Sequence, residues 1–205
     1  LNASGKYKFR YRRVNPAGEI AYDTTAVREN GDINATRLEA GLYGTIERGT
    51  WNAKVYNYNS ERGIPGAIVN NVWRRGERVW DTNSFFQGSF VKEVNDQFKT
   101  QVNAKYAFYR THYVNNDDKL IEVDNLYKQR EVYVSTANMY TIFPFWDVSM
   151  SYDFQWNEMK ADMNGFVFPT RFTNLLSIAT ALRLGKVKLQ GSGLATFVND
   201  RVKDC

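Results

Sequence analysis

The sequence predicts an all-β fold, namely part of a transmembrane antiparallel β-barrel with about nine of its strands in this chain. Three observations predict it: one very long alternating segment, the recurrence of that pattern, and the spacing of the connections. From residue 146 to residue 156 every even position is apolar or aromatic and every odd position is polar. This two-residue period is typical of a strand, and membrane-crossing strands need roughly 9 to 11 residues, whereas strands in soluble domains average about 5 to 6.

The same alternation recurs along the chain, beginning with aromatic residues between lysines and arginines at positions 6–12. Later segments carry apolar residues at Leu38, Ala40, Leu42 and Ile46, then at Phe98, Val102, Ala104, Tyr106 and Phe108. The last two strands follow the rule with exceptions at Leu175 and Leu194. We therefore expect strands at residues 4–13, 33–46, 50–59, 79–92, 97–111, 130–142, 145–157, 170–184 and 186–198.

The connections alternate between short and long. Short turns are expected at residues 47–49, 95–96, 144 and 185, and long polar segments at 15–31, 61–78, 113–128 and 157–169. Outer-membrane barrels have short turns on the periplasmic side and long loops outside. A large soluble sheet with one face on a core is the alternative that the strand pattern alone leaves open.

Residues 1–205 are interpreted as one partial barrel domain. Nine strands is an odd number, and an open sheet edge in lipid would leave backbone groups unpaired, so we expect a fragment of a larger barrel. Aromatic residues next to the short turns predict an interfacial girdle: Trp51, Phe143, Phe145 and Trp146, with Trp80 and Trp156 near the opposite interface. Taken singly, each of them is better explained as a core aromatic, whereas their clustering at the strand ends favours the girdle.

Composition argues against several other functions. The net charge of +5 is spread over many strands, so we expect no nucleic-acid partner. Cys205 is the only cysteine and His112 the only histidine, so no disulfide framework, cofactor, metal site or enzyme is expected. A hydrolase embedded in the barrel remains an alternative. Residues 115–118 offer oxygen ligands for calcium, but their spacing favours a solvated acidic loop.

Two stretches resemble the barrels of TonB-dependent outer-membrane receptors of the Bacteroidetes type. One reads YNSERGIPGA at Tyr58–Ala67 and continues as RVWDTN at Arg78–Asn83. The other reads YRRVN at Tyr11–Asn15 and DTTAVR at Asp23–Arg28. The resemblance extends over nearly the whole chain.

This resemblance implies a plugged barrel of about 22 strands in the cell outer membrane. It also implies an N-terminal plug domain, which is not present in this chain, and uptake driven by the inner-membrane energy-coupling complex. Outer-membrane lipid and a surface lipoprotein are the other partners it suggests. The cargo would be a large scarce nutrient such as a corrinoid (cobalamin, for example) or an iron chelate. A glycan receptor and a passive outer-membrane porin are the alternatives.

We predict substrate-binding residues in and beside the segment 61–78. These are Arg62, Trp73, Arg74, Arg75 and Arg78. Guanidinium and indole groups suit carboxylates, phosphates and stacked rings. The alternative is that these arginines meet anionic lipopolysaccharide or water.

Overall fold

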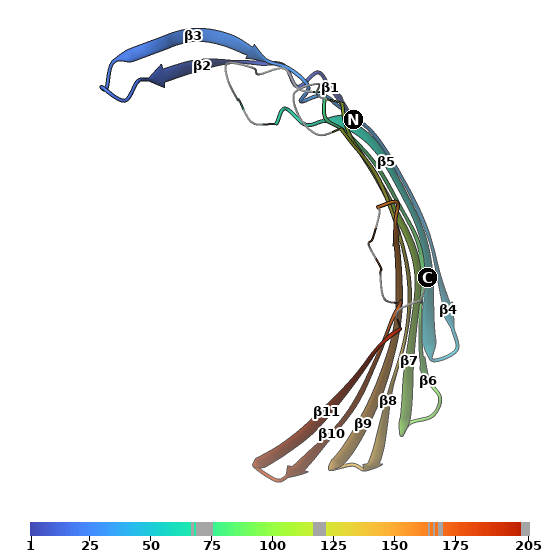
Figure 1. Ribbon diagram of the computed structural model, residues 1–205. Helices are drawn as coiled ribbons and strands as arrows, with labels where there is room; N and C mark the ends of the chain where they lie inside the picture. Colours follow the sequence, from blue (N-terminus) through green and yellow to red (C-terminus); the bar gives the residue numbers. More distant parts are fainter. Residues whose placement is uncertain are drawn as a thin grey trace. The chain divides into compact units, whose positions relative to one another are not determined.

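The computed structural model describes residues 1–66, 68, 76–116, 122–163, 165, 167 and 170–201, and in them it confirms the all-β prediction (Figure 1). The described residues form no helix that is both long and apolar enough to cross a bilayer. The strands are β1 (Asn2–Ala3), β2 (Tyr7–Val14), β3 (Ile20–Arg28), β4 (Ile33–Ile46), β5 (Gly49–Gly63), β6 (Arg78–Glu93), β7 (Phe98–Asn115), β8 (Val123–Phe143), β9 (Trp146–Ala161), β10 (Thr170–Leu184) and β11 (Val187–Arg201).

Nine strands form one antiparallel sheet in the order β1-β4-β5-β6-β7-β8-β9-β10-β11. From β4 onward each strand therefore lies beside the next one in the sequence, as the alternation of turns predicts. The chain divides into two compact units, and the long strands run through both. Unit 1 comprises Leu1–Arg37, Tyr58–Thr82 and Arg110–Leu126, and unit 2 comprises Leu38–Asn57, Asn83–Tyr109 and Tyr127–Cys205.

The four short turns all lie in unit 2, at residues 47–48, 94–97, 144–145 and 185–186. Arg48 and Gly185 adopt positive φ angles of 54° and 59°, which tight hairpin turns require. Arg48 Nη2 also donates to Asp96 Oδ1 at 2.6 Å, joining two neighbouring turns. This hydrogen bond raises the pKa of Arg48 above its usual value, so the turn carries a fixed positive charge.

The expectation of a long loop at 15–31 is wrong. Residues 20–28 form β3, which pairs with β2 in a separate two-stranded sheet, and the short strand β1 lies beside β4 in the larger sheet. Asn15 closes the hairpin, because its Oδ1 accepts from the backbone N–H groups of Ala17 and Glu19. The β-branched and aromatic residues of segment 20–28 favour an extended partner for β2.

The other long connections are shorter than predicted. Strand β5 continues to Gly63, β7 to Asn115 and β9 to Ala161, while β8 already begins at Val123. Parts of the segments 61–78, 113–128 and 157–169 are therefore strand. These strand ends carry many polar side chains, so the alternation of apolar and polar positions does not identify them as strand. Backbone pairing does not require such an alternation.

The register of β8 to β11 confirms the two-faced pattern. Met150 lies opposite Ile178 of β10 and Asn138 of β8, and Tyr152 lies opposite Leu176. Directly opposite residues share a face, so the apolar residues of neighbouring strands gather on one side of the sheet, interrupted by a few polar residues such as Asn138. The other face is polar, with Ser151 Oγ and Ser177 Oγ 2.6 Å apart.

Polar groups on the apolar face are hydrogen-bonded to one another. Trp146 Nε1 donates to Thr180 Oγ1 at 2.8 Å, and Tyr152 OH donates to Asn174 Oδ1 at 2.6 Å. Thr100 Oγ1 donates to Asn138 Oδ1 at 2.8 Å. Such pairing lowers the cost of placing these groups in an apolar medium.

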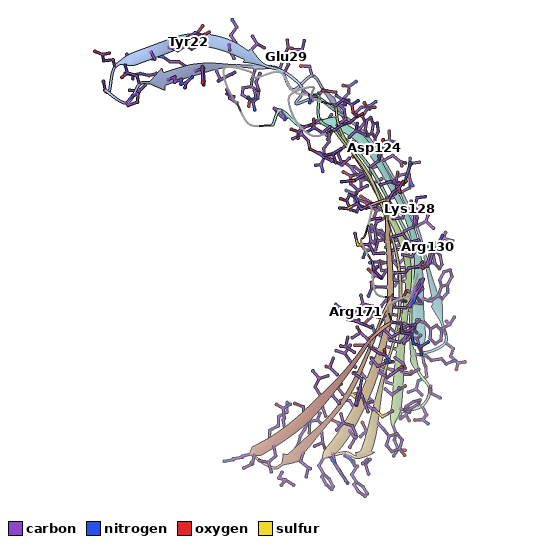
Figure 2. All side chains as sticks on the ribbon, in the orientation of Figure 1. Tyr22, Glu29, Asp124, Lys128, Arg130 and Arg171 are labelled. Atoms are coloured by element: carbon purple, nitrogen blue, oxygen red, sulfur yellow. The ribbon has the colours of Figure 1, made fainter. Side chains whose placement is uncertain are left out.

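The sheet lacks a hydrophobic core of its own among the described residues. Their only buried apolar side chains are three alanines and Val79, whereas Met150 and Ile178 are 46% and 56% exposed. Side chains project from both faces of the ribbon (Figure 2). A soluble sheet would bury such a face under a second layer, so its exposure here favours contact with lipid.

Replacing Met150 with Arg tests whether this face meets lipid. We expect impaired barrel assembly in outer-membrane vesicles, because a midplane arginine costs about 2 to 4 kcal/mol. Heat-modifiable migration of the full-length protein measures assembly. Ser149→Arg is the matched control, since Ser149 is the neighbouring residue and lies opposite Ala179 on the polar face. Equal assembly of the two variants would show that the even face of β9 is outside the membrane.

Candidate functional site

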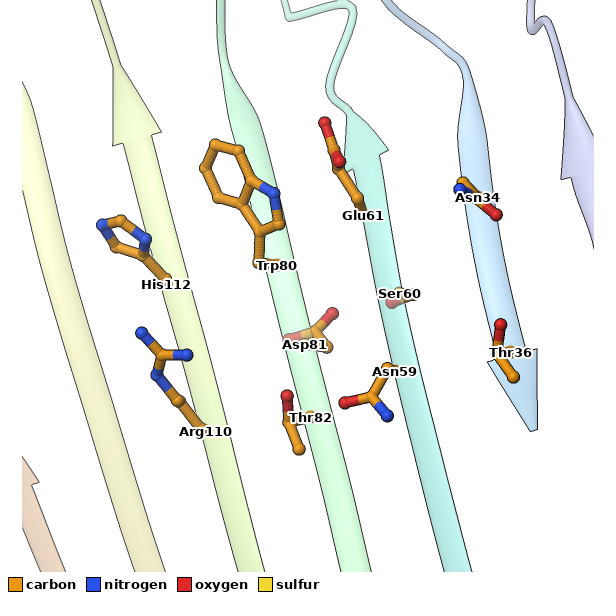
Figure 3. A pocket seen from close by; sticks show the side chains of 10 residues that line it. All are labelled: Asn34, Thr36, Asn59, Ser60, Glu61, Trp80, Asp81, Thr82, Arg110 and His112. Carbon is orange, nitrogen blue, oxygen red and sulfur yellow. The ribbon is translucent and has the colours of Figure 1, made fainter. Parts of the chain in front are cut away.

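The candidate site is a groove at the ends of β4 to β7 farthest from the short turns, entirely within unit 1 (Figure 3). Its volume is about 430 Å³. Each strand contributes two or three lining residues: Asn34 and Thr36 from β4, Asn59, Ser60 and Glu61 from β5, Trp80, Asp81 and Thr82 from β6, and Arg110 and His112 from β7.

Side-chain contacts identify two faces at this end of the sheet. On the first, called the groove face, the rings of Trp80 and His112 lie with centroids 5.3 Å apart. His112 Nε2 is also 2.6 Å from Asp124 Oδ1. On the second, called the Asp81 face, Thr111 Oγ1 donates to Asp81 Oδ1 at 2.8 Å. Since successive strand residues point to opposite sides, Trp80 and Asp81 belong to different faces, as do His112 and Thr111.

Two of the predicted substrate-binding arginines lie in the described residues, and they lie on opposite faces. Arg62 Nη2 is 3.2 Å from Asp81 Oδ2, so Arg62 belongs to the Asp81 face. Arg78 pairs with Glu61, the residue before Arg62 on β5, so it belongs to the groove face. Trp73, Arg74 and Arg75 lie outside the described residues, as do Asp117 and Asp118 of the considered calcium loop.

Arg78 is already engaged by two carboxylates. Its Nη1 donates to Asp32 at 2.8 and 2.9 Å and to Asn30 Oδ1 at 3.3 Å, and its Nη2 donates to Glu61. An anionic ligand would have to compete with these groups for Arg78. The contact joins the segment after β3 to the ends of β5 and β6.

The segment around Asn30 is held closely against the start of the connection 64–77. Asn30 Nδ2 donates to the carbonyl oxygens of Ile64 and Glu77 at 3.0 and 2.8 Å, and Asn30 itself has a φ of 60°. Buried Arg28 donates to the carbonyl oxygens of Pro65 and Gly66. The first residues of the connection that carries Trp73, Arg74 and Arg75 are therefore fixed by the segment that follows β3.

Sequence reasoning overlooked most of this site. The sequence predicts an interfacial aromatic at Trp80 and an isolated histidine at His112, and it predicts no role for Arg110, Asn34 or Asn30. One signal was present: Arg110 and His112 continue the even positions, which from Phe98 to Phe108 are apolar or aromatic except at Thr100. The pairing of Asn30 with residues 64 and 77 has no local signal at all.

Gly63→Ala tests how the segment after β3 is held. A Cβ at Gly63 would lie 2.2 Å from Asn30 Oδ1 and 2.6 Å from the Asn30 carbonyl oxygen, so this contact must open. We expect amide exchange at residues 28–32 to accelerate at least about tenfold, equivalent to about 1.4 kcal/mol. Gly88→Ala is the control, because its Cβ would meet only the Asn52 carbonyl oxygen, at 3.4 Å. Unchanged exchange in Gly63→Ala would refute the close contact.

Comparison with known proteins finds a likeness in structure but none in sequence. No family model matches the chain, and no curated protein matches it in sequence. Among solved structures, the chain is similar to the ferric citrate transporter FecA in its unliganded form, with a TM-score of 0.55 and 13% sequence identity. The match covers 96% of this chain and 34% of FecA, so the chain spans about a third of the length of that transporter. At this identity the likeness establishes the fold: the sheet is like part of a transporter β-barrel.

Proposed function

We propose that this chain belongs to a TonB-dependent outer-membrane transporter that takes up a large scarce nutrient such as a corrinoid or an iron chelate. The observation that carries the proposal is the nine-stranded antiparallel sheet with one exposed apolar face and one polar face, which matches the FecA fold over 96% of the chain. In such a barrel the apolar face meets lipid and the polar face lines the lumen.

The polar face has the properties of a lumen wall. Lys105 Nζ lies 3.1 Å from Glu131 Oε1 and 3.3 Å from Tyr109 OH, and Lys54 Nζ lies 2.6 Å from Glu39 Oε1. These charges neutralise one another in pairs within unit 2. A wall of paired charges binds water but has no strong net electrostatic potential of one sign. Such a wall suits the passage of a large polar cargo.

Transport against a gradient needs an energy source. In this proposal a plug domain, outside these residues, closes the lumen and contacts the inner-membrane energy-coupling complex. A surface lipoprotein would help to capture cargo at the long connections. These parts rest on the family resemblance of the sequence.

Cargo recognition is assigned to Arg62 together with Trp73, Arg74, Arg75 and Arg78. Arg62 supports this role best, because it lies on the Asp81 face and its side chain is 52% exposed. A carboxylate or phosphate of the cargo would replace or join Asp81 beside this guanidinium. Arg78, on the groove face, would contribute only after its carboxylate partners are displaced.

The transport mode is tested with the full-length protein in a planar bilayer and in cells. We expect no steady ion current, because a plug closes the lumen, and cellular uptake that an uncoupler of the proton-motive force abolishes. A large continuous conductance with uncoupler-insensitive uptake would instead establish the passive porin. Uptake limited to oligosaccharides would establish the glycan receptor.

Cargo binding is tested by Trp73→Ala and Arg75→Gln. Each charge-assisted hydrogen bond contributes about 1.5 to 3 kcal/mol, so we expect cargo affinity to fall roughly tenfold to a hundredfold in Arg75→Gln. Binding of cobalamin and of ferric citrate is measured on cells. Arg183→Gln is the control, since Arg183 pairs with Asp147 beside the β10–β11 turn. Equal affinity in all variants would remove these residues from the cargo site.

A further inference from the structure

We propose that the hairpin of β2 and β3 binds an extended acidic segment of a partner polypeptide, along a row of cationic side chains on one of its faces. Both strands belong to unit 1 and pair only with each other among the described residues (Figure 1). The hairpin contains none of the residues assigned to cargo, so the segment is a second partner. The proposed function supplies only the location of this partner, which is the cell surface.

Most of the net positive charge of the chain lies in this hairpin. Residues 6–28 contain six basic and two acidic residues, which gives a net charge of +4 against +5 for the whole chain. We expected the charge to be spread over many strands, and the count by segment shows instead that one hairpin concentrates it. Such a surface attracts anionic partners and speeds their association.

The strand pairing arranges three of these cations in a row. Lys8, Arg10 and Arg12 are alternate residues of β2, so they share one face of the hairpin, and all three are exposed. We call them the cationic row. Alternate residues of a strand lie about 6.6 to 6.8 Å apart. Every second side chain of an extended polypeptide has the same spacing, so acidic residues at alternate positions match the row.

Two members of the cationic row, Lys8 and Arg12, form no salt bridge within the part of the chain that the structure describes. Arg10 is paired, because its Nε and Nη2 donate to Asp23 Oδ1 and Oδ2 at 2.8 and 2.6 Å. Asp23 attracts Arg12 only at longer range. The row therefore keeps a charge of +2 after its pairing with Asp23, and this charge is available to carboxylates of a partner.

The other carboxylates of the hairpin are also engaged. Glu29 Oε1 lies 3.9 Å from Lys6 Nζ beside the base of the hairpin, and Glu19 Oε2 accepts from Asn15 Nδ2 at 3.1 Å in the turn. With Glu29 included, residues 6–29 still have a net charge of +3. The acidic residues of the hairpin thus do not neutralise the cationic row.

Apolar side chains beside the cationic row favour a polypeptide over an anionic polysaccharide. Val27 lies opposite Lys8 and is 40% exposed. At the turn end, Val14 lies opposite Ile20, and these side chains are 49% and 53% exposed. A polypeptide has apolar side chains that can cover these groups, whereas a polysaccharide with charged hydroxylated rings gains little from them.

The test measures the binding of two labelled peptides to the full-length protein in detergent by fluorescence anisotropy. One peptide alternates Glu and Thr, the other contains the same residues as one Glu block followed by one Thr block, and both have blocked termini. Their composition and charge are equal, so only the spacing of the carboxylates differs. We expect the alternating peptide to bind about threefold to tenfold more tightly at low ionic strength.

The variant that tests the cationic row combines Lys8→Gln with Arg12→Gln. Exposed ion pairs contribute modestly, so we expect the affinity for the alternating peptide to fall roughly threefold to thirtyfold. Arg13→Gln is the matched control, because Arg13 is the neighbour of Arg12 and lies on the other face. It should keep the preference for the alternating peptide. If the double variant fails to assemble, Lys8→Gln alone replaces it and should lower the affinity about twofold to fivefold.

Equal binding of the two peptides, or an equal loss of affinity in Arg13→Gln, would overturn the inference, because total charge and not the row would then explain binding. Displacement of the peptide by polygalacturonate at equal carboxylate concentration would also overturn it and indicate a polysaccharide site. Cargo uptake without any peptide binding would refute this inference alone. Peptide binding by a continuously conducting pore would refute the transporter and leave the hairpin site standing.

Discussion

The hydrogen-bond ladder between neighbouring antiparallel strands is the interaction on which the rest of this structure depends. Among the described residues the sheet has almost no buried apolar side chains, so packing cannot hold β4 to β11 together. Backbone pairing in a fixed register does so, and it continues over fifteen residue pairs between β10 and β11. In lipid this pairing is obligatory, because an unpaired backbone group has no water to bind.

The ladder also divides the side chains between two environments. Residues opposite one another share a face, so Met150 and Ile178 extend one apolar surface while Ser151 and Ser177 join on the other. The same rule separates the side chains at the other end of the sheet. A one-residue step from Glu61 to Arg62 moves a side chain from the groove face, beside Arg78, to the Asp81 face.

The segment following β3 adds a second level of organisation. Arg28 and Asn30 bind carbonyl groups of residues 64–66 and 77 and thereby fix both described ends of the connection that carries Trp73, Arg74 and Arg75. Gly63 permits this approach, because any side chain there would meet Asn30.

The amino-acid sequence by itself determined the strands and their faces, because alternation and turn residues act over neighbouring positions. Residues 33–46 and 170–184 are strands with the predicted bounds, and the short turns fall where the turn residues lie. Only the tertiary structure decided that β3 pairs with β2, that Arg62 and Arg78 lie on opposite faces, and that Asn30 meets Gly63. These outcomes depend on the register between strands and on contacts across more than thirty residues, and neither leaves a periodic trace in the chain.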